Sequence, residues 1–349
     1  MVKHLRILYL QCLNIGDAVI GTGLVEALSG DGVDIEVLTR RGSASIYANN
    51  PSVAKVHTAE FPMGTNWKFT IGDAARLFMH LNGLRGRRYD AAVGVTGDLR
   101  ENAMGWFVSG GKACGPQFSA DNPFLRVGHS GLTGLLHRKV ECPADRNNIY
   151  DIVRDVSVAM GARKPARQRV YHSSSREPIL NDRTGRAIGL HPLSGGACRR
   201  WPIENWRQLA STLRAGGFPV VLLGAPGERD WLNENFNGLI GNGVEIATGS
   251  VEEFFVQLSK LRLLIGLDSF SIHAAYAVDT PAVMICGPQP SNFFAPPETQ
   301  VVKAVDGVAC YPCFNRPTCQ GSPDEFLCMR RISVEAVIAA MERLDVRLG

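Results

Sequence analysis

Residues 263–287 read LLIGLDSFSIHAAYAVDTPAVMICG, and this stretch decides the fold. The apolar run at 263–266 is typical of a buried strand. A polar loop follows it, then a helical pattern at 271–277 and a second apolar run at 282–285. Short apolar strands joined through a helix are typical of a parallel sheet with helices on both faces. The stretch therefore predicts one strand–helix–strand unit of an α/β domain.

The same alternation extends outward through both halves of the chain. Further strands are predicted at 5–10, 35–38, 91–95, 187–190, 219–223 and 244–247. Helices are predicted at 18–28, 71–84, 203–213, 228–236, 251–259 and 334–344. The segment 163–186 interrupts the rhythm, because it is rich in Arg, Ser and Pro and poor in apolar residues. We therefore expect two doubly wound, Rossmann-like α/β domains, 1–170 and 171–349, facing across a cleft.

Composition narrows the class of protein. Of 349 residues, 45% are hydrophobic and 20% charged, as in soluble globular proteins. No apolar run approaches the roughly 20 residues of a membrane-spanning helix. The first residues read as a strand rather than a signal peptide, so we expect a cytoplasmic protein. The net charge of +4 comes without a basic, aromatic-rich stripe, which argues against nucleic acid and suits anionic phosphates or an anionic membrane face.

Loops after the predicted strands carry the candidate site residues, because ligands of open α/β sheets bind there. The first loop contains Asn14, Gly16 and Asp17 just before a helix. Capping is the usual role of aspartate at a helix start, and the residues alone favour it. The alternative is a general base, since a carboxylate is ionised at neutral pH and can accept a hydroxyl proton.

The second loop, 191–202, has the composition of a phosphate site. Gly195 and Gly196 let backbone N–H groups approach an anion, and Ser194 adds a hydroxyl. Arg199 or Arg200 can hold a diphosphate through two parallel hydrogen bonds. The alternative is an exposed glycine loop with solvated arginines, and we favour the phosphate interpretation.

Two further loops hold acidic residues. Glu228 either binds a ribose diol or is a first-turn glutamate without a ligand, and both interpretations stay open. Asp268, with the hydroxyls of Ser269 and Ser271 at a helix start, can bind sugar hydroxyls or phosphate oxygens. His273 lies one turn further in, where a lone histidine is usually a core residue. No Gly-x-Gly-x-x-Gly, Walker A or Gly-x-Ser-x-Gly motif is present, which weakens dehydrogenase, NTPase and serine hydrolase interpretations.

Four cysteines lie close together near the C-terminus, in the segment 310–328. Cys310 and Cys313 form a Cys-x-x-Cys pair, and Cys319 and Cys328 follow. This spacing is that of a tetrahedral thiolate site, so a structural zinc or iron ion is one interpretation. Reduced thiols packing an irregular loop, or disulfides, are the others.

Taken in order, these blocks resemble glycosyltransferase family 9, the bacterial ADP-heptose:lipopolysaccharide heptosyltransferases. The resemblance covers nearly the whole chain and rests on residues 14–19, 191–206, 224–228 and 268–288. It implies a GT-B fold, with the acceptor bound by the first domain and the sugar nucleotide by the second. It also implies an inverting transfer that needs no metal or other cofactor. A cysteine cluster of this kind is similar to the iron-binding finger of related autotransporter heptosyltransferases.

The resemblance also implies roles for single residues. Asp17 becomes the general base, with Asn14 and Gly16 on the acceptor side. Arg199, where the family usually has Lys, stabilises the departing diphosphate. On the donor side the resemblance places phosphate, ribose and sugar contacts at Ser194, Gly195, Gly196, Arg200, Glu228, Asp268, Ser269, Ser271 and His273. Phe270 departs from the glycine common in the family, which alters the expected sugar pocket.

The predicted partners are an ADP-sugar donor and a glycan or lipopolysaccharide-core acceptor, with peripheral contact to the inner membrane. Two alternatives remain. One is a nucleotide-sugar 2-epimerase, which shares the fold and needs no acceptor. The other is a non-catalytic family member that acts as a binding scaffold.

Overall fold

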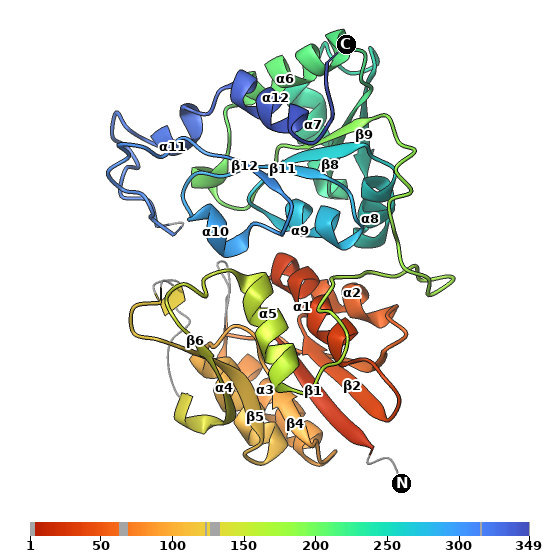
Figure 1. The fold of residues 1–349 in the computed structure, drawn as a ribbon, viewed down its shortest axis with the longest axis vertical. Helices are drawn as coiled ribbons and strands as arrows, with labels where there is room; N and C mark the ends of the chain where they lie inside the picture. Colours follow the sequence, from red (N-terminus) through yellow and green to blue (C-terminus); the bar gives the residue numbers. More distant parts are fainter. Residues whose placement is uncertain (1–3, 63–68, 123, 126–132, 315, 349) are drawn as a thin grey trace. The chain divides into compact units, whose positions relative to one another are not determined.

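The computed structural model describes residues 4–62, 69–122, 124–125, 133–314 and 316–348. The chain forms two compact units, Met1–Pro178 and Ile179–Gly349, and each is described by itself (Figure 1). Each unit contains a six-stranded sheet whose paired strands all run parallel. This confirms the predicted α/β class with two doubly wound domains.

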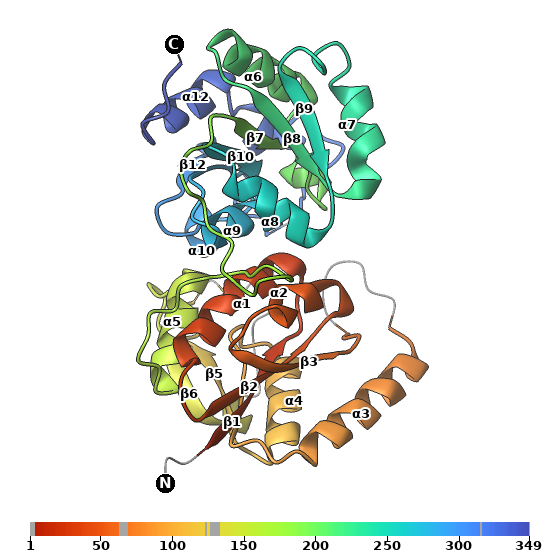
Figure 2. The same cartoon turned by 90° about the vertical axis from the view of Figure 1, so that its right-hand side faces the viewer.

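In the first unit the sheet has the strand order β3-β2-β1-β4-β5-β6. Helices α1 and α5 pack together on one face, and α3 and α4 on the other (Figure 2). Residues on both sides of β1 are therefore buried, which explains its unalternating apolar sequence. The elements are β1 Leu5–Gln11, α1 Ile15–Leu28, β2 Val33–Thr39, α2 Ala44–Ala48, β3 Val53–Thr58, α3 Ile71–Arg85, β4 Ala91–Val93, α4 Leu99–Ser109, β5 Ala113–Phe118, β6 Leu136–Cys142 and α5 Ile149–Ala159.

In the second unit the sheet has the strand order β12-β11-β10-β7-β8-β9. Helices α6 and α12 contact each other on one face, and α8 and α9 contact each other on the opposite face (Figure 2). The elements are β7 Ile188–His191, α6 Ile203–Ala215, β8 Val220–Gly224, α7 Arg229–Asn235, β9 Val244–Thr248, α8 Val251–Ser259, β10 Leu263–Leu267, α9 Phe270–Ala277, β11 Ala282–Ile285, α10 Ser291–Phe294, β12 Gln300–Val302, α11 Leu327–Arg330 and α12 Val334–Glu342.

Each sheet has a point where the chain changes direction. In the first unit the chain moves outward from β1 to β3 and restarts beside β1 with β4. In the second unit it moves outward from β7 to β9 and restarts beside β7 with β10. Ligands of doubly wound sheets bind beyond the carboxyl ends of the strands at this switch point. The topology therefore directs attention to the loops after β1 and β4, and after β7 and β10.

The division between the units lies after residue 178, C-terminal to the boundary predicted at 170 but inside the segment 163–186. Contacts to the first unit hold the intervening residues there. The Tyr171 hydroxyl donates to Glu26 Oε1 at 2.9 Å, and the Arg176 guanidinium donates to the Asn50 carbonyl at 3.2 Å. Because these contacts depend on tertiary structure, the composition of the segment could not place the division more closely.

Among the helices of the described residues, none combines the length and the apolar character that crossing a membrane requires.

Candidate active site

The switch point of the second unit brings together two of the predicted loops. β7 and β10 are paired with His191 opposite Gly266, so the loops that follow these strands begin at the same level. Arg199 Nη1 donates to the backbone carbonyl of Asp268 at 3.0 Å. This hydrogen bond links the loop with the phosphate-site composition to the loop with the acidic residue.

Local contacts fix the position of Arg199. It ends a short 3-10 helix, η4 Ala197–Arg199, in which its backbone N–H donates to the Gly196 carbonyl at 3.1 Å. Two residues later the buried Trp201 donates from its indole N–H to the Ile332 carbonyl at 2.9 Å. Its ring also meets Trp206 edge to face, with 5.1 Å between centroids. The arginine therefore stands on a loop anchored in the core.

Several polar atoms near this switch point are buried without a hydrogen-bond partner in the described part of the chain. They are His191 Nδ1, Ser194 Oγ, Arg199 Nε and Gln289 Oε1. All four belong to residues at or beyond the carboxyl ends of β7 and β11. Leaving a buried polar atom unpaired costs about 1–3 kcal/mol, so such atoms in one region indicate a place where a ligand supplies the missing partners.

Burial governs the charge state of the histidines here. It lowers the pKa of His191 and of His273 to about 4, so both rings are neutral at neutral pH. Burial also raises the pKa of Asp268, while the Arg199 guanidinium works in the opposite direction. At neutral pH the positive charge in these loops therefore comes from arginine.

The remaining predicted donor residues differ from one another in burial and in their contacts. Ser269 Oγ and Ser271 Oγ lie 3.2 Å apart at the start of α9, and Ser271 is fully buried. Arg200 is exposed, and a Cβ at Gly195 would meet no atom within 4 Å. The Glu228 carboxylate accepts from the Ala225 N–H at 2.7 Å, so the first-turn interpretation describes its observed contact.

In the first unit Asp17 takes the capping geometry that the residues alone favoured. Helix α1 begins at Ile15, and Asp17 Oδ2 accepts from the Asn14 N–H at 3.1 Å. One backbone hydrogen bond uses only part of the accepting capacity of a carboxylate. The capping contact and a role in proton transfer are therefore compatible. Gly16 lies in the same first turn.

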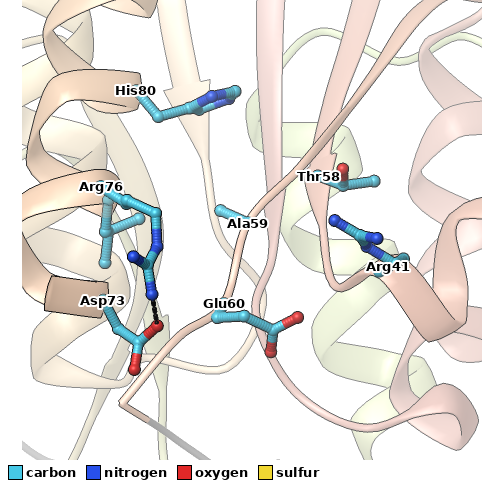
Figure 3. Close-up of a pocket in the computed structure, with 8 residues that line it drawn as sticks. Arg41, Thr58, Ala59, Glu60, Asp73, Arg76 and His80 are labelled. Carbon is cyan, nitrogen blue, oxygen red and sulfur yellow. Dashed lines mark hydrogen bonds and ion pairs between the residues drawn. The ribbon is translucent and has the colours of Figure 1, made fainter. Parts of the chain in front are cut away.

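A cavity of about 250 Å³ lies where β3 ends, between α3 and the short helix η1 Arg41–Ser43. Figure 3 shows Asp73, Arg76 and His80 along α3 and Arg41 on the opposite side. Arg76 and Asp73 form an ion pair at 2.5 Å, and His80 Nε2 is buried without a partner among the described residues. The lining consists of Arg41, Thr58, Ala59, Glu60, Asp73, Arg76, Leu77 and His80. Sequence reasoning missed this cavity, although Arg40-Arg41 directly after a strand could have drawn attention to it.

Sequence reasoning also missed Gln289, which follows β11 between two prolines. Its position after a buried strand was the available signal, but a lone glutamine in a proline-rich loop is weak evidence of a site. Its buried, unpartnered Oε1 becomes visible only in three dimensions.

The predicted metal site at the cysteines finds no support. Cys310, Cys313 and Cys319 are half-buried and Cys328 is buried. Cys319 Sγ accepts from the Phe326 N–H at 3.5 Å. Burial and the neighbouring thiols raise the pKa of Cys328 to about 11. Within the described ranges no three Cys, His, Asp or Glu side chains are placed to hold an ion, so the residues as they stand do not fit a metal.

Comparison with known proteins agrees with this fold and identifies the family. Residues 78–322 match the family model described as glycosyltransferase family 9 (heptosyltransferase). The lipopolysaccharide heptosyltransferase 3 of Escherichia coli is 22% identical over 296 residues, which cover 80% of this chain and 83% of that protein.

Among solved structures, the E. coli heptosyltransferase WaaC with ADP-2-deoxy-2-fluoro heptose is similar with a TM-score of 0.72 at 18% identity, covering 97% of this chain and 100% of WaaC. A family 9 glycosyltransferase from Veillonella parvula gives a TM-score of 0.71 at 17% identity, covering 98% and 97%. These likenesses show the GT-B fold, and the family model spans well over half of the sequence. The chain therefore belongs to glycosyltransferase family 9 and is a glycosyltransferase enzyme.

Proposed function

We propose that this enzyme transfers a heptose from ADP-heptose to a lipopolysaccharide core or a related glycan acceptor, with inversion and without a metal ion. The observation that carries the proposal is the group of buried, unpartnered polar atoms around Arg199. The similar proteins support the sugar nucleotide, since one is named a lipopolysaccharide heptosyltransferase and another was solved with an ADP-heptose analogue.

Different donor residues bind the diphosphate, the ribose and the heptose of the sugar nucleotide. Arg199 holds the diphosphate, assisted by Arg200, by the Ser194 hydroxyl and by backbone N–H groups of Gly195 and Gly196. This suits a guanidinium, because its planar fork of N–H donors matches two phosphate oxygens. The ribose binds at Glu228. The heptose binds at Asp268, Ser269 and Ser271, with His273 as a neutral neighbour.

The reaction needs one proton transfer and one displacement. Asp17 accepts the proton of the acceptor hydroxyl while that oxygen forms a bond to the anomeric carbon of the heptose. The bond from that carbon to the β-phosphate oxygen breaks on the opposite face, so the configuration inverts and ADP leaves with both bonding electrons. Arg199 compensates the negative charge that develops on the departing diphosphate.

The acceptor binds in the first unit, near Asn14, Gly16 and the cavity at the end of β3. Arg41 and Arg76 line that cavity together with His80. Burial and the neighbouring His57 lower the pKa of His80, so the arginines carry the positive charge. Asp73 pairs with Arg76, and Glu60 lies 3.9 Å from Arg40, so we assign to Arg41 an anionic group of the acceptor, a carboxylate or a phosphate. We place the enzyme in the cytoplasm, at the inner face of the inner membrane, where a net charge of +4 favours an anionic lipid surface.

A thermal-shift titration tests the donor. A ligand that binds only the native state raises the melting temperature, and at equal concentration a tighter ligand raises it more. We expect shifts with ADP and ADP-heptose and smaller ones with UDP or GDP; the reverse order would remove ADP-heptose as donor. Consumption of the sugar nucleotide in the presence and absence of acceptor glycan then separates the alternatives. Turnover without acceptor indicates a 2-epimerase, and binding without any turnover indicates a scaffold.

A further inference from the structure

A carboxyl group lies buried at the switch point of the first unit, where sequence reasoning assigned no role. Glu101 lies in the first turns of α4 and is 1% exposed. Its helix follows β4, which pairs with β1 so that Val93 is opposite Tyr9. The loop after β4 and the first turn of α1 therefore start from neighbouring strand ends, and the Asp17 charge acts on Glu101.

Only one of the two carboxyl oxygens of Glu101 forms hydrogen bonds to the described residues. Its Oε2 accepts from the Thr96 backbone N–H at 3.1 Å and from the Thr96 hydroxyl at 2.7 Å. Its Oε1 is buried and meets no partner among the described residues. The backbone makes room for this carboxyl, since a Cβ at Gly94 would lie 2.4 Å from Oε2. Thus Glu101 holds the strand-to-helix loop in place while half of its carboxyl group stays unsatisfied.

The surroundings of Glu101 disfavour a negative charge. Asp17 from α1 and Asp98 at the start of α4 both act on it with like charge. From β1 and the loop beyond it, Tyr9 and Cys12 face it, and burial keeps both of these uncharged. Two cations act on the neighbouring Cys12, and both are engaged. Arg100 donates to both Asp98 oxygens at 2.9 and 2.7 Å, and Arg40 donates to the Cys12 carbonyl at 3.0 Å.

Burial is the largest cause acting on this carboxyl and raises the pKa of Glu101 to about 8; the two Thr96 hydrogen bonds oppose this rise, and the like charges of Asp98 and Asp17 add to it. At neutral pH the group is therefore a neutral acid, and its O–H lies on the oxygen that the Thr96 bonds leave available. An ionised Glu101 would lie in buried surroundings and would be repelled by the charges of Asp98 and Asp17.

We propose that Glu101 is a positioning residue for Asp17: buried and bonded to Thr96, it fixes the 94–98 loop, which follows the strand paired with the one that leads into the first turn of α1. The proposal rests on the proposed role of Asp17 as the base. Ionisation of Glu101 then breaks the arrangement, and the rate of transfer falls with it.

Glu101→Gln tests the proposal, because glutamine copies the neutral acid: its carbonyl accepts from Thr96 and its amide replaces the O–H. We expect kcat of the wild type to fall above about pH 8 and kcat of Glu101→Gln to stay level there. Glu101→Ala, which loses both Thr96 bonds, should lose at least tenfold in kcat at every pH with an unchanged KM for ADP-heptose. Glu141→Gln, at an exposed carboxylate of the same unit, is the matched control and should follow the wild type.

A second measurement does not depend on activity. The folded-state pKa of Glu101 lies above its unfolded value near 4.5, so this group stabilises the fold fully below pH 4.5 and loses that effect as pH rises toward 8. Between pH 5 and 8 the unfolding constant of the wild type should rise about tenfold per pH unit relative to Glu101→Gln. If the unfolding constants of the wild type and of Glu101→Gln depend equally on pH, Glu101 is ionised in the folded protein and the proposal is overturned.

The two measurements also separate this proposal from the proposed function. The wild type and Glu101→Gln could differ in how the unfolding constant depends on pH and still show the same dependence of kcat on pH. Glu101 would then be a neutral acid that does not position Asp17. That result would refute the inference without affecting the proposed transferase function. Full activity of Asp17→Asn would instead remove the base itself, whatever the unfolding data show.

Discussion

Replacing Arg199 by methionine gives the sharpest test of the donor site. Methionine keeps most of the apolar stem and removes the guanidinium, so it deletes the 3.0 Å bond to the Asp268 carbonyl and the buried Nε donor. We expect ADP to bind much more weakly, because its diphosphate loses a charged, two-point partner.

The magnitude follows from the bonds removed. A hydrogen bond to a charged group contributes about 1.5–3 kcal/mol, and Arg199 is proposed to donate two to the diphosphate. Allowing for water that replaces part of the interaction, we take about 3 kcal/mol as the loss. At about 1.4 kcal/mol per factor of ten, the Kd for ADP should rise roughly 100-fold.

Isothermal titration calorimetry with ADP at pH 7.5 measures this change. Arg200→Met is the comparison variant, because it removes the same charge from the adjacent, exposed arginine, to which we assign only an assisting role. We expect it to raise the Kd less than about threefold, in keeping with the small energies of exposed ion pairs. Circular dichroism of both variants checks that they are folded. If Arg200→Met weakens ADP as much as Arg199→Met does, net charge rather than the anchored geometry binds the diphosphate, and the reasoning fails.

Three further predictions address the first unit. Asp17→Asn should lower kcat by about 10²–10⁴ while calorimetry finds the Kd for ADP unchanged; more than a tenth of wild-type activity would argue against a general base. Arg41→Ala should raise the KM for an anionic acceptor several-fold and leave the KM for ADP-heptose alone, so parallel changes in both constants would contradict an acceptor role for the cavity. Gly21→Ala should destabilise the fold by about 1–3 kcal/mol in urea titrations, because its Cβ would lie 1.9 Å from the Tyr9 hydroxyl oxygen. Gly30→Ala, whose Cβ would meet nothing within 4 Å, should show no such loss, and equal losses would exclude the steric explanation.

The hydrophobic pattern of the sequence predicted those strands and helices in which apolar residues form an unbroken run or recur with a regular period. The strand Ala282–Ile285 and the helix Val251–Ser259 were predicted with the bounds that the structure has. Strand β6 escaped because it lies at the sheet edge and alternates buried Leu136 and Val140 with exposed His, Arg and Lys side chains. Helix α4 was not predicted, because polar side chains, Glu101 among them, occupy buried positions and interrupt its apolar period.

The site could be predicted only in pieces. Glycine, serine and arginine in a loop after a strand indicated Arg199, and an acidic loop after another strand indicated Asp268. Their hydrogen bond depends on β7 and β10 being neighbours, although two strands separate them in the sequence, and sheet order is not encoded locally. Glu101 gave no signal, because a glutamate in the first turn of a helix is ordinarily a solvated residue at a helix start.

The end of the first unit has a practical meaning for domain exchange. Residues 171–178 contact the first unit through Tyr171 and Arg176, so they belong to it structurally although they follow its last helix. A chimera that joins the first unit of one relative to the second unit of another keeps these pairs intact when the splice comes after 178. A splice at 170 would replace the partners of Glu26 and Asn50 with foreign side chains. The choice of splice point thus decides whether the two units can be recombined with their internal contacts intact.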